Sequence, residues 1–106
     1  MFEVRELRRA RADIASIVDW LFARSSAGAA AWLDAYDEMV TRLKADPEAF
    51  GEAPENATVD RVLKQTLFKT RRGRTYRAIF FTDNETVYIL RVRGPEQAPV
   101  EPSNLF

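Results

Sequence analysis

Residues 76–93 read YRAIFFTDNETVYILRVR, and this stretch decides the fold of the chain. Tyr76 to Thr82 is dense in aromatic and β-branched side chains, and Thr86 to Arg93 alternates with a period of two, as strands do. The short polar run at 83–85, Asp-Asn-Glu, separates the two segments and indicates a turn. The stretch therefore predicts a β-hairpin.

The segment before the hairpin adds a third strand. Val62 to Phe68 alternates with a period of two, and RRGRT at 71–75 supplies a turn that contains a glycine. Three successive strands joined by short turns predict an antiparallel meander. Residues 46–60 hold two prolines, one glycine and no sustained periodicity, so they are predicted to form a loop.

Two helices are predicted upstream of this loop. Apolar side chains recur at helical spacing in two sets, which are Ile14, Ile17, Val18 and Leu21, and then Trp32, Tyr36, Met39 and Leu43. These sets predict helices over about 10–23 and 27–45. Pro47 ends the second helix, because the residue before a proline is pushed out of the helical region.

Residues 1–7 alternate apolar and charged side chains and predict a short N-terminal strand. The order strand, helix, helix, loop and three strands predicts an α+β fold, with a two-helix hairpin packed on one face of a small antiparallel sheet. At 106 residues the chain is long enough for one domain and too short for two. Residues 1–97 are therefore predicted to form a single domain, and 98–106 a proline-containing tail.

The strand pattern also predicts which side chains face the helices. The expected row is Tyr76, Ala78 and Phe80 on the middle strand, with Tyr88, Leu90 and Val92 on the last one. Trp20, Trp32 and Tyr36 lie on helical stripes and are expected in the core. The acidic residues of the second helix are expected to form a solvated face, and they are Asp34, Asp37 and Glu38.

Composition excludes several kinds of site. The chain has no Cys and no His, which excludes zinc sites, thiol nucleophiles and serine-histidine-aspartate triads. We therefore expect no metal and no cofactor. Because the sequence shows neither a signal segment nor a membrane-spanning stretch, the expected location is the cytoplasm, with no membrane partner.

The net charge of zero conceals a division of charge along the chain. Residues 12–60 carry ten acidic and three basic residues, and residues 61–93 carry nine basic and two acidic residues. The corresponding net charges are −7 and +7. This polarity predicts an anionic partner for the second segment.

Two basic clusters are predicted within residues 61–93. The first is expected to converge on the sheet face opposite the helices, from alternate positions of three strands, and consists of Lys64, Arg77, Arg91 and Arg93. The second lies in the turn around Gly73 and consists of Lys69, Arg71, Arg72 and Arg74. The first cluster could bind phosphate and stabilise a phosphoryl transition state, and the second could grip a nucleic-acid backbone. The alternative for both is a solvated surface.

Five segments carry a resemblance to a known family. They are ADIASIVDWLFARSSAGAAAWLDAY (12–36), LKADPEAFGEAPE (43–55), VLKQTLF (62–68), YRAIFF (76–81) and VYILRVRG (87–94). In this order they resemble the RelE/ParE superfamily of type II toxin–antitoxin modules, whose toxins are also called plasmid-stabilisation proteins. The resemblance covers about residues 2–97. It implies a toxin that is neutralised by an antitoxin encoded beside it, and one of two activities, ribosome-dependent messenger RNA cleavage or noncatalytic poisoning of DNA gyrase.

The resemblance also implies site residues for the cleaving activity. Lys64 matches a strand lysine of the cleaving members, Arg77 matches the arginine of their Tyr-Arg pair, and Arg93 lies near their late arginine. Thr66 stands where a second lysine would be. The chain after Arg93 has no Tyr, His, Lys or Arg to take and return a proton. The remaining candidates for that task are Glu96, Tyr76 and Tyr88.

This departure favours the gyrase inhibitor over the ribonuclease, and a degenerate, non-toxic member is the third alternative. An acidic amphipathic antitoxin segment is expected to cover the open sheet face. Its carboxylates would pair with Arg77, Arg91 or Arg93, and its aliphatic groups would contact Ile79 and Ile89.

Overall fold

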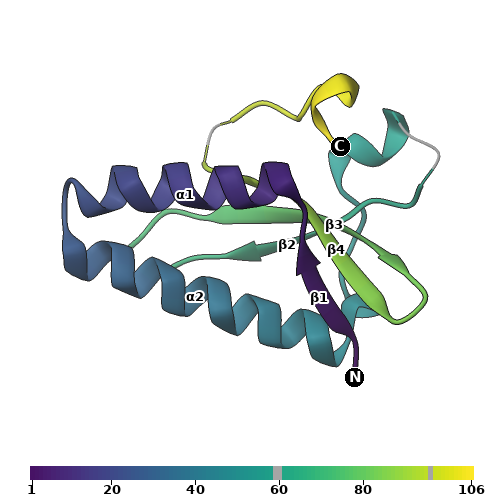
Figure 1. Ribbon diagram of the computed structural model, residues 1–106, viewed down its shortest axis with the longest axis horizontal. Coiled ribbons are helices and arrows are strands. Elements are labelled where there is room, and N and C mark those ends of the chain that lie inside the picture. Colours follow the sequence, from purple (N-terminus) through teal and green to yellow (C-terminus); the bar gives the residue numbers. More distant parts are fainter. Residues whose placement is uncertain (59–60, 96) are drawn as a thin grey trace.

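The computed structural model describes residues 1–58, 61–95 and 97–106 and confirms the α+β fold (Figure 1). Its main elements are β1 (Glu3–Glu6), α1 (Arg8–Phe22), α2 (Ser26–Ala45), β2 (Lys64–Phe68), β3 (Tyr76–Asp83) and β4 (Thr86–Arg93). Short 3-10 helices cover Pro47–Ala49, Pro54–Thr58 and Pro102–Asn104. Within the described residues, no helix has the length and apolar character needed to cross a membrane.

The two helices begin and end where local chemistry dictates. The Ser25 hydroxyl accepts a hydrogen bond from the Gly28 amide and caps the start of α2. At the other end, Arg42 and Lys44 lie in the last turn, where basic side chains interact favourably with the negative end of the helix dipole. The helices form a hairpin along one side of the sheet.

The sheet has the strand order β1-β4-β3-β2 and is mixed. The meander pairs antiparallel as predicted, and its hairpin turns at Asn84, which has a φ of 56° that Asn tolerates well. β1, however, pairs parallel to β4, from Glu3 opposite Thr86 to Glu6 opposite Ile89. An alternating pattern shows that a segment is a strand, but it does not show the direction in which that strand pairs.

A bulge in β4 corrects the expected assignment of faces. Ile79 pairs with Arg91, but its neighbour Phe80 pairs with Ile89, so Leu90 is an extra residue in β4. The alternation is therefore shifted by one residue before the bulge. Val92 faces the helices as predicted, whereas Tyr88 and Leu90 face away from them, and Val87 and Ile89 take their place.

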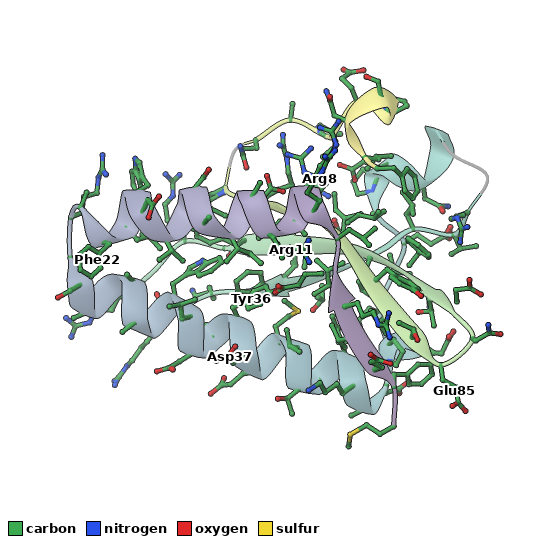
Figure 2. The ribbon with its side chains drawn as sticks, viewed as in Figure 1. Arg8, Arg11, Phe22, Tyr36, Asp37 and Glu85 are labelled. Carbon is green, nitrogen blue, oxygen red and sulfur yellow. The ribbon has the colours of Figure 1, made fainter. Side chains whose placement is uncertain are left out.

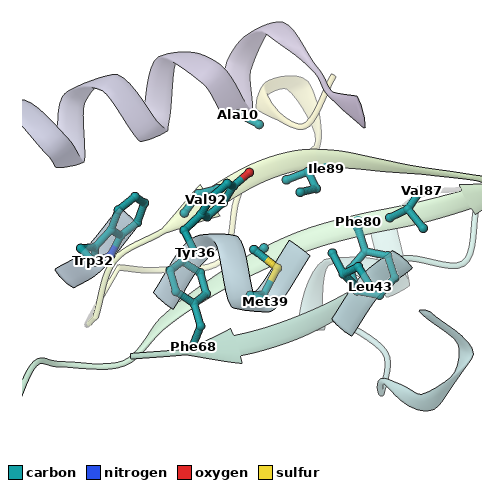
Figure 3. Close-up of a cluster of buried hydrophobic side chains, with 11 residues drawn as sticks. Ala10, Trp32, Tyr36, Met39, Leu43, Phe68, Phe80, Val87, Ile89 and Val92 are labelled. Carbon is teal, nitrogen blue, oxygen red and sulfur yellow. The ribbon is translucent and has the colours of Figure 1, made fainter. Parts of the chain in front are cut away.

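The main core lies between the helical hairpin and the sheet (Figure 3). Its buried side chains are Ala10, Trp32, Tyr36, Met39, Leu43, Phe68, Ala78, Phe80, Val87, Ile89 and Val92. Trp32 and Tyr36 are buried as predicted, and their rings stack with centroids 5.6 Å apart. Trp20 was expected there as well, but it is 54% exposed, because it lies on the flank of the stripe that α1 turns toward the core.

The second face of the sheet is not open, as the sequence suggested, but covered by other segments of the chain. Ile79, Phe81 and Leu90 of the sheet pack there with four further buried residues, Ala53, Leu63, Val100 and Leu105. The last two come from the C-terminal tail. The loop and the tail each supply apolar side chains to this small second core. Both segments contain prolines and lack periodicity, so the sequence carries no sign of these contacts.

Candidate functional site

Arg77 is held by a buried carboxylate. Its two terminal nitrogens donate to the two oxygens of Glu55, with Nη1–Oε1 and Nη2–Oε2 distances of 2.9 and 2.6 Å. The Glu55 side chain is 0% exposed, and its Oε2 also accepts from the Val100 amide at 2.8 Å. A bidentate arginine-carboxylate pair is strong and directional. It therefore ties β3 to the Pro54–Thr58 helix and to the C-terminal tail.

Arg91 forms a second bidentate pair, with Asp13 of α1. Its Nε and Nη2 lie 2.7 and 2.9 Å from the two Asp13 oxygens, and its Nη1 donates to the Asn104 carbonyl. Asp13 also accepts from the Val92 amide at 2.9 Å. Because β1 pairs with β4 only as far as Ile89, this edge of β4 lacks a strand partner, and the Asp13 carboxylate takes its place.

Arg93 lies directly opposite Arg77 in the register, so these two arginines are neighbours, as predicted. Its Nη2 donates to the Ala98 carbonyl at 2.9 Å, and its Nε has no hydrogen-bond partner among the described residues. The sheet arginines thus share a face, but Asp13, Glu55 and carbonyls of the tail occupy most of their donors. The segment after β4 therefore lies across this face of the sheet.

Lys64 does not join this group, although the sequence suggested that it would. It pairs with Phe80, and residues paired across an antiparallel ladder point to the same face. Phe80 belongs to the main core, so Lys64 lies on the helix side, where its Nζ is 3.2 Å from the Glu48 carbonyl and 3.6 Å from the Glu48 carboxylate. Alternation along residues 62–68 predicts a strand, but it does not show the register that decides which face Lys64 takes.

The pKa shifts agree with these contacts. Burial would raise the pKa of Glu55, but the hydrogen bonds from Arg77 and from backbone amides outweigh burial, and the pKa lies below its ordinary value. The hydrogen bond from Arg91 to Asp13 raises the pKa of Arg91. Burial lowers the pKa of Arg93, and the neighbouring Arg91 lowers it further. Glu55 is therefore a fixed anion and a poor proton acceptor.

The candidates for proton transfer are engaged in packing. Tyr76 packs edge-on against Trp32, with ring centroids 5.5 Å apart, and Tyr88 stacks on Phe81 at 5.1 Å. Glu96 lies outside the described residues. The partner-binding candidates Ile79 and Ile89 are fully buried on opposite faces of the sheet. A role for them at an interface stays a prediction, and it would require the covering segments to move.

The turn between β2 and β3 presents the second basic cluster at the surface. All four of its basic residues are exposed: Lys69, Arg71, Arg72 and Arg74. Lys69 and Arg71 line a small hollow together with two acidic residues of α2, Asp34 and Glu38. Arg72 and Arg74 instead line a groove of about 690 Å³ that also includes residues on either side of the turn joining α1 and α2. In Figure 2 this turn lies at the labelled Phe22.

Sequence reasoning missed the two acidic residues that organise the sheet arginines. Asp13 lies at a polar position of an amphipathic helix, and Glu55 lies in a segment with no periodicity. Neither position carries a local signal, because each carboxylate meets its arginine only across the tertiary fold. The acidic excess of residues 12–60 was the one indication that the basic segment had partners within the chain.

Comparison with known proteins agrees with the fold. A family model described as the ParE toxin of type II toxin-antitoxin system, parDE, matches residues 4–99. No curated protein matches the chain. The matched range begins in β1 and extends beyond β4, so it includes both helices and all of the sheet except Glu3. The chain therefore belongs to the ParE toxin family of type II toxin–antitoxin systems, and this membership implies an antitoxin partner.

Proposed function

We propose that this protein arrests growth in the cytoplasm by binding and inhibiting DNA gyrase, and that it does so without cleaving RNA. The observation that carries the proposal is the state of the sheet arginines. Arg77 and Arg91 are each bound in bidentate fashion to a carboxylate of the same chain. Their charge supports the fold and is not directed at an external phosphate.

Cleavage of RNA makes demands that this arrangement meets poorly. A phosphoryl transition state needs donors aimed at developing negative charge, and a group nearby that takes and returns a proton. Lys64 lies on the face opposite Arg77, and arginine cannot act as a base. Glu55 is next to Arg77, but its lowered pKa and its ion pair make it unsuited to proton transfer. Inhibition by binding needs none of these groups.

Two assays on the same protein test the proposal. Purified toxin is added to gyrase and relaxed plasmid, and supercoiling and cleaved-complex formation are followed on gels. In parallel, primer extension maps cuts in translated messages after induction. We expect loss of supercoiling activity or trapped DNA breaks, intact messages, and relief of both gyrase effects when the antitoxin is added.

The alternatives give different results in these assays. Codon-phased cuts that disappear in Arg77→Ala, with normal gyrase activity, would establish the ribosome-dependent endonuclease instead. Normal gyrase activity, intact messages and unimpaired growth after induction would show a degenerate, non-toxic member. Either outcome would refute gyrase inhibition.

A further inference from the structure

The groove near the turn that joins α1 and α2 has no role in the proposal above. It is bounded by the C-terminal half of α1, the start of α2, the turn between β2 and β3, and the residues after β4. Ile17, Leu21 and Trp32 supply apolar surface to the groove, and Trp20 also lines it. A hollow of this size can hold several apolar side chains of a partner.

Trp20 is placed for contact with such a partner. More than half of its surface is exposed, and the neighbouring Phe22 is 63% exposed. The guanidinium carbon of Arg24 lies 3.6 Å from the centre of the Trp20 ring, and Arg24 Nη1 donates to the Trp20 carbonyl. These contacts hold the indole in place through a cation-π interaction. Exposed aromatic residues beside an apolar hollow mark binding surfaces, and Trp and Arg dominate the energetics of such surfaces.

The charge of the residues that line the groove indicates which charge a partner should carry. Arg72 and Arg74 line the groove, and among the lining residues that the structure describes there is no Asp or Glu. Lys69 and Arg71 of the same turn instead lie beside acidic residues of α2. A partner seated in the groove would therefore gain from a carboxylate that faces the exposed Arg72, and a basic partner would be repelled.

We propose that this groove is the docking site for an acidic amphipathic segment of the antitoxin. Its apolar side chains pack on Ile17, Trp20 and Leu21, and a carboxylate of the segment pairs with Arg72. The site lies near the turn that joins α1 and α2, and not on the sheet face that the sequence suggested. That sheet face is already covered by other segments of the chain. The proposal rests on the antitoxin partner that the family implies, and it is independent of gyrase as the target.

Titration of the toxin with the antitoxin encoded beside it tests this docking site. Trp20→Ala and Arg72→Glu should each raise the dissociation constant by about 10- to 100-fold, the range of truncated hot spots. Two matched controls change similar groups away from the groove: Leu33→Ala, on the outer side of α2, and Arg8→Glu, at the opposite end of α1. Both controls should stay within about twofold of the unmodified protein.

Tryptophan quenching gives a second readout that does not depend on affinity. The chain has two tryptophans, and Trp32 is only 2% exposed, so acrylamide quenching reports mainly on Trp20. Quenching should fall when a Trp-free antitoxin segment binds. Unchanged quenching in a saturated complex, or equal weakening by the control variants, would place the antitoxin elsewhere. Protection of Trp20 that already appears in the toxin alone and rises with its concentration would show that a second copy fills the groove, and would also overturn the proposal.

No step of this experiment involves gyrase or RNA. If the groove variants bind the antitoxin normally while gyrase is still inhibited, the docking site is wrong and the proposed function stands. If the groove variants lose the antitoxin but gyrase is unaffected by the toxin, the docking site stands and the proposed function fails.

Discussion

The arginines of the sheet and the arginines of the β2–β3 turn come from the same basic stretch of sequence, but they have different surroundings. Arg77 and Arg91 are largely buried and are bound by Glu55 and Asp13. Arg72 and Arg74 are exposed beside an apolar groove. A count of basic residues cannot separate these two groups. The difference lies in where the acidic half of the chain folds, because Asp13 and Glu55 pair with the sheet arginines, whereas Arg72 lies exposed at the turn.

This comparison separates stability from binding. Arginines that hold the loop and the tail against the sheet should affect folding when they are changed. Arginines at the groove should affect the partner and leave folding nearly unchanged.

Loss of Arg77 should produce the largest change in stability. In Arg77→Met the Glu55 carboxylate remains fully buried without its arginine, and removal of one partner from a buried pair typically costs about 3–5 kcal/mol. Denaturant titration should show this loss. The double variant Glu55→Gln/Arg77→Met removes the stranded charge and should recover a large part of it. Equal instability of the single and double variants would show that the pair is not the stabilising contact.

Truncation of Leu90 tests whether the second face is a true core. Leu90 is fully buried there, so Leu90→Ala should lower the free energy of unfolding by about 2–5 kcal/mol. Leu67 on β2 is 56% exposed and provides the control, because Leu67→Ala should cost less than about 0.5 kcal/mol. Similar losses for both variants would mean that the tail and loop do not cover the sheet.

Acid should weaken the covered face through Glu55. The pKa of Glu55 is lower in the folded protein than its ordinary value, so the unfolded chain binds the proton more readily. The stability that Glu55 provides is therefore complete above its ordinary pKa of 4.5 and is lost as the pH falls through the lower folded value. Urea titrations between pH 3 and pH 7 should show a smaller loss for Glu55→Gln than for the unmodified protein. Parallel curves would contradict this role.

The smallest effect on folding is expected at the groove. Trp20 is half exposed, so Trp20→Ala should change the free energy of unfolding by less than about 1 kcal/mol, although a buried tryptophan would cost about 3–5 kcal/mol. Trp32→Ala is the matched comparison, because Trp32 is buried in the main core. If the two variants unfold alike, Trp20 is part of the core and is not available to a partner.

The sequence predicted much of the architecture, because helical and strand periodicity are local properties. The spacing of Trp32, Tyr36, Met39 and Leu43 placed α2 correctly, and the alternation of residues 76–93 predicted the hairpin. The errors arose where a tertiary contact decides the outcome. The bulge at Leu90 reversed the faces of half a strand, and the register moved Lys64 to the helix side.

The candidate site was less predictable than the fold for the same reason. Basic residues are visible in a sequence, but the carboxylates that neutralise them come from distant segments, 78 positions away in the case of Asp13 and Arg91. The groove is likewise formed by parts of both helices, the turn between β2 and β3, and the residues after β4. No single segment of the sequence therefore indicates it. The one part of it visible in advance was the charge of the turn.

The most direct test compares the two arginine groups in one binding measurement. Antitoxin affinity is measured by calorimetry for Glu55→Gln/Arg77→Met and for Arg72→Glu, under conditions in which unfolding curves show both variants to be folded. We predict that the sheet double variant binds within about threefold of the unmodified toxin, and that Arg72→Glu binds about 10- to 100-fold more weakly. Weakened binding by the sheet double variant together with normal binding by Arg72→Glu would contradict the division between structural and binding arginines.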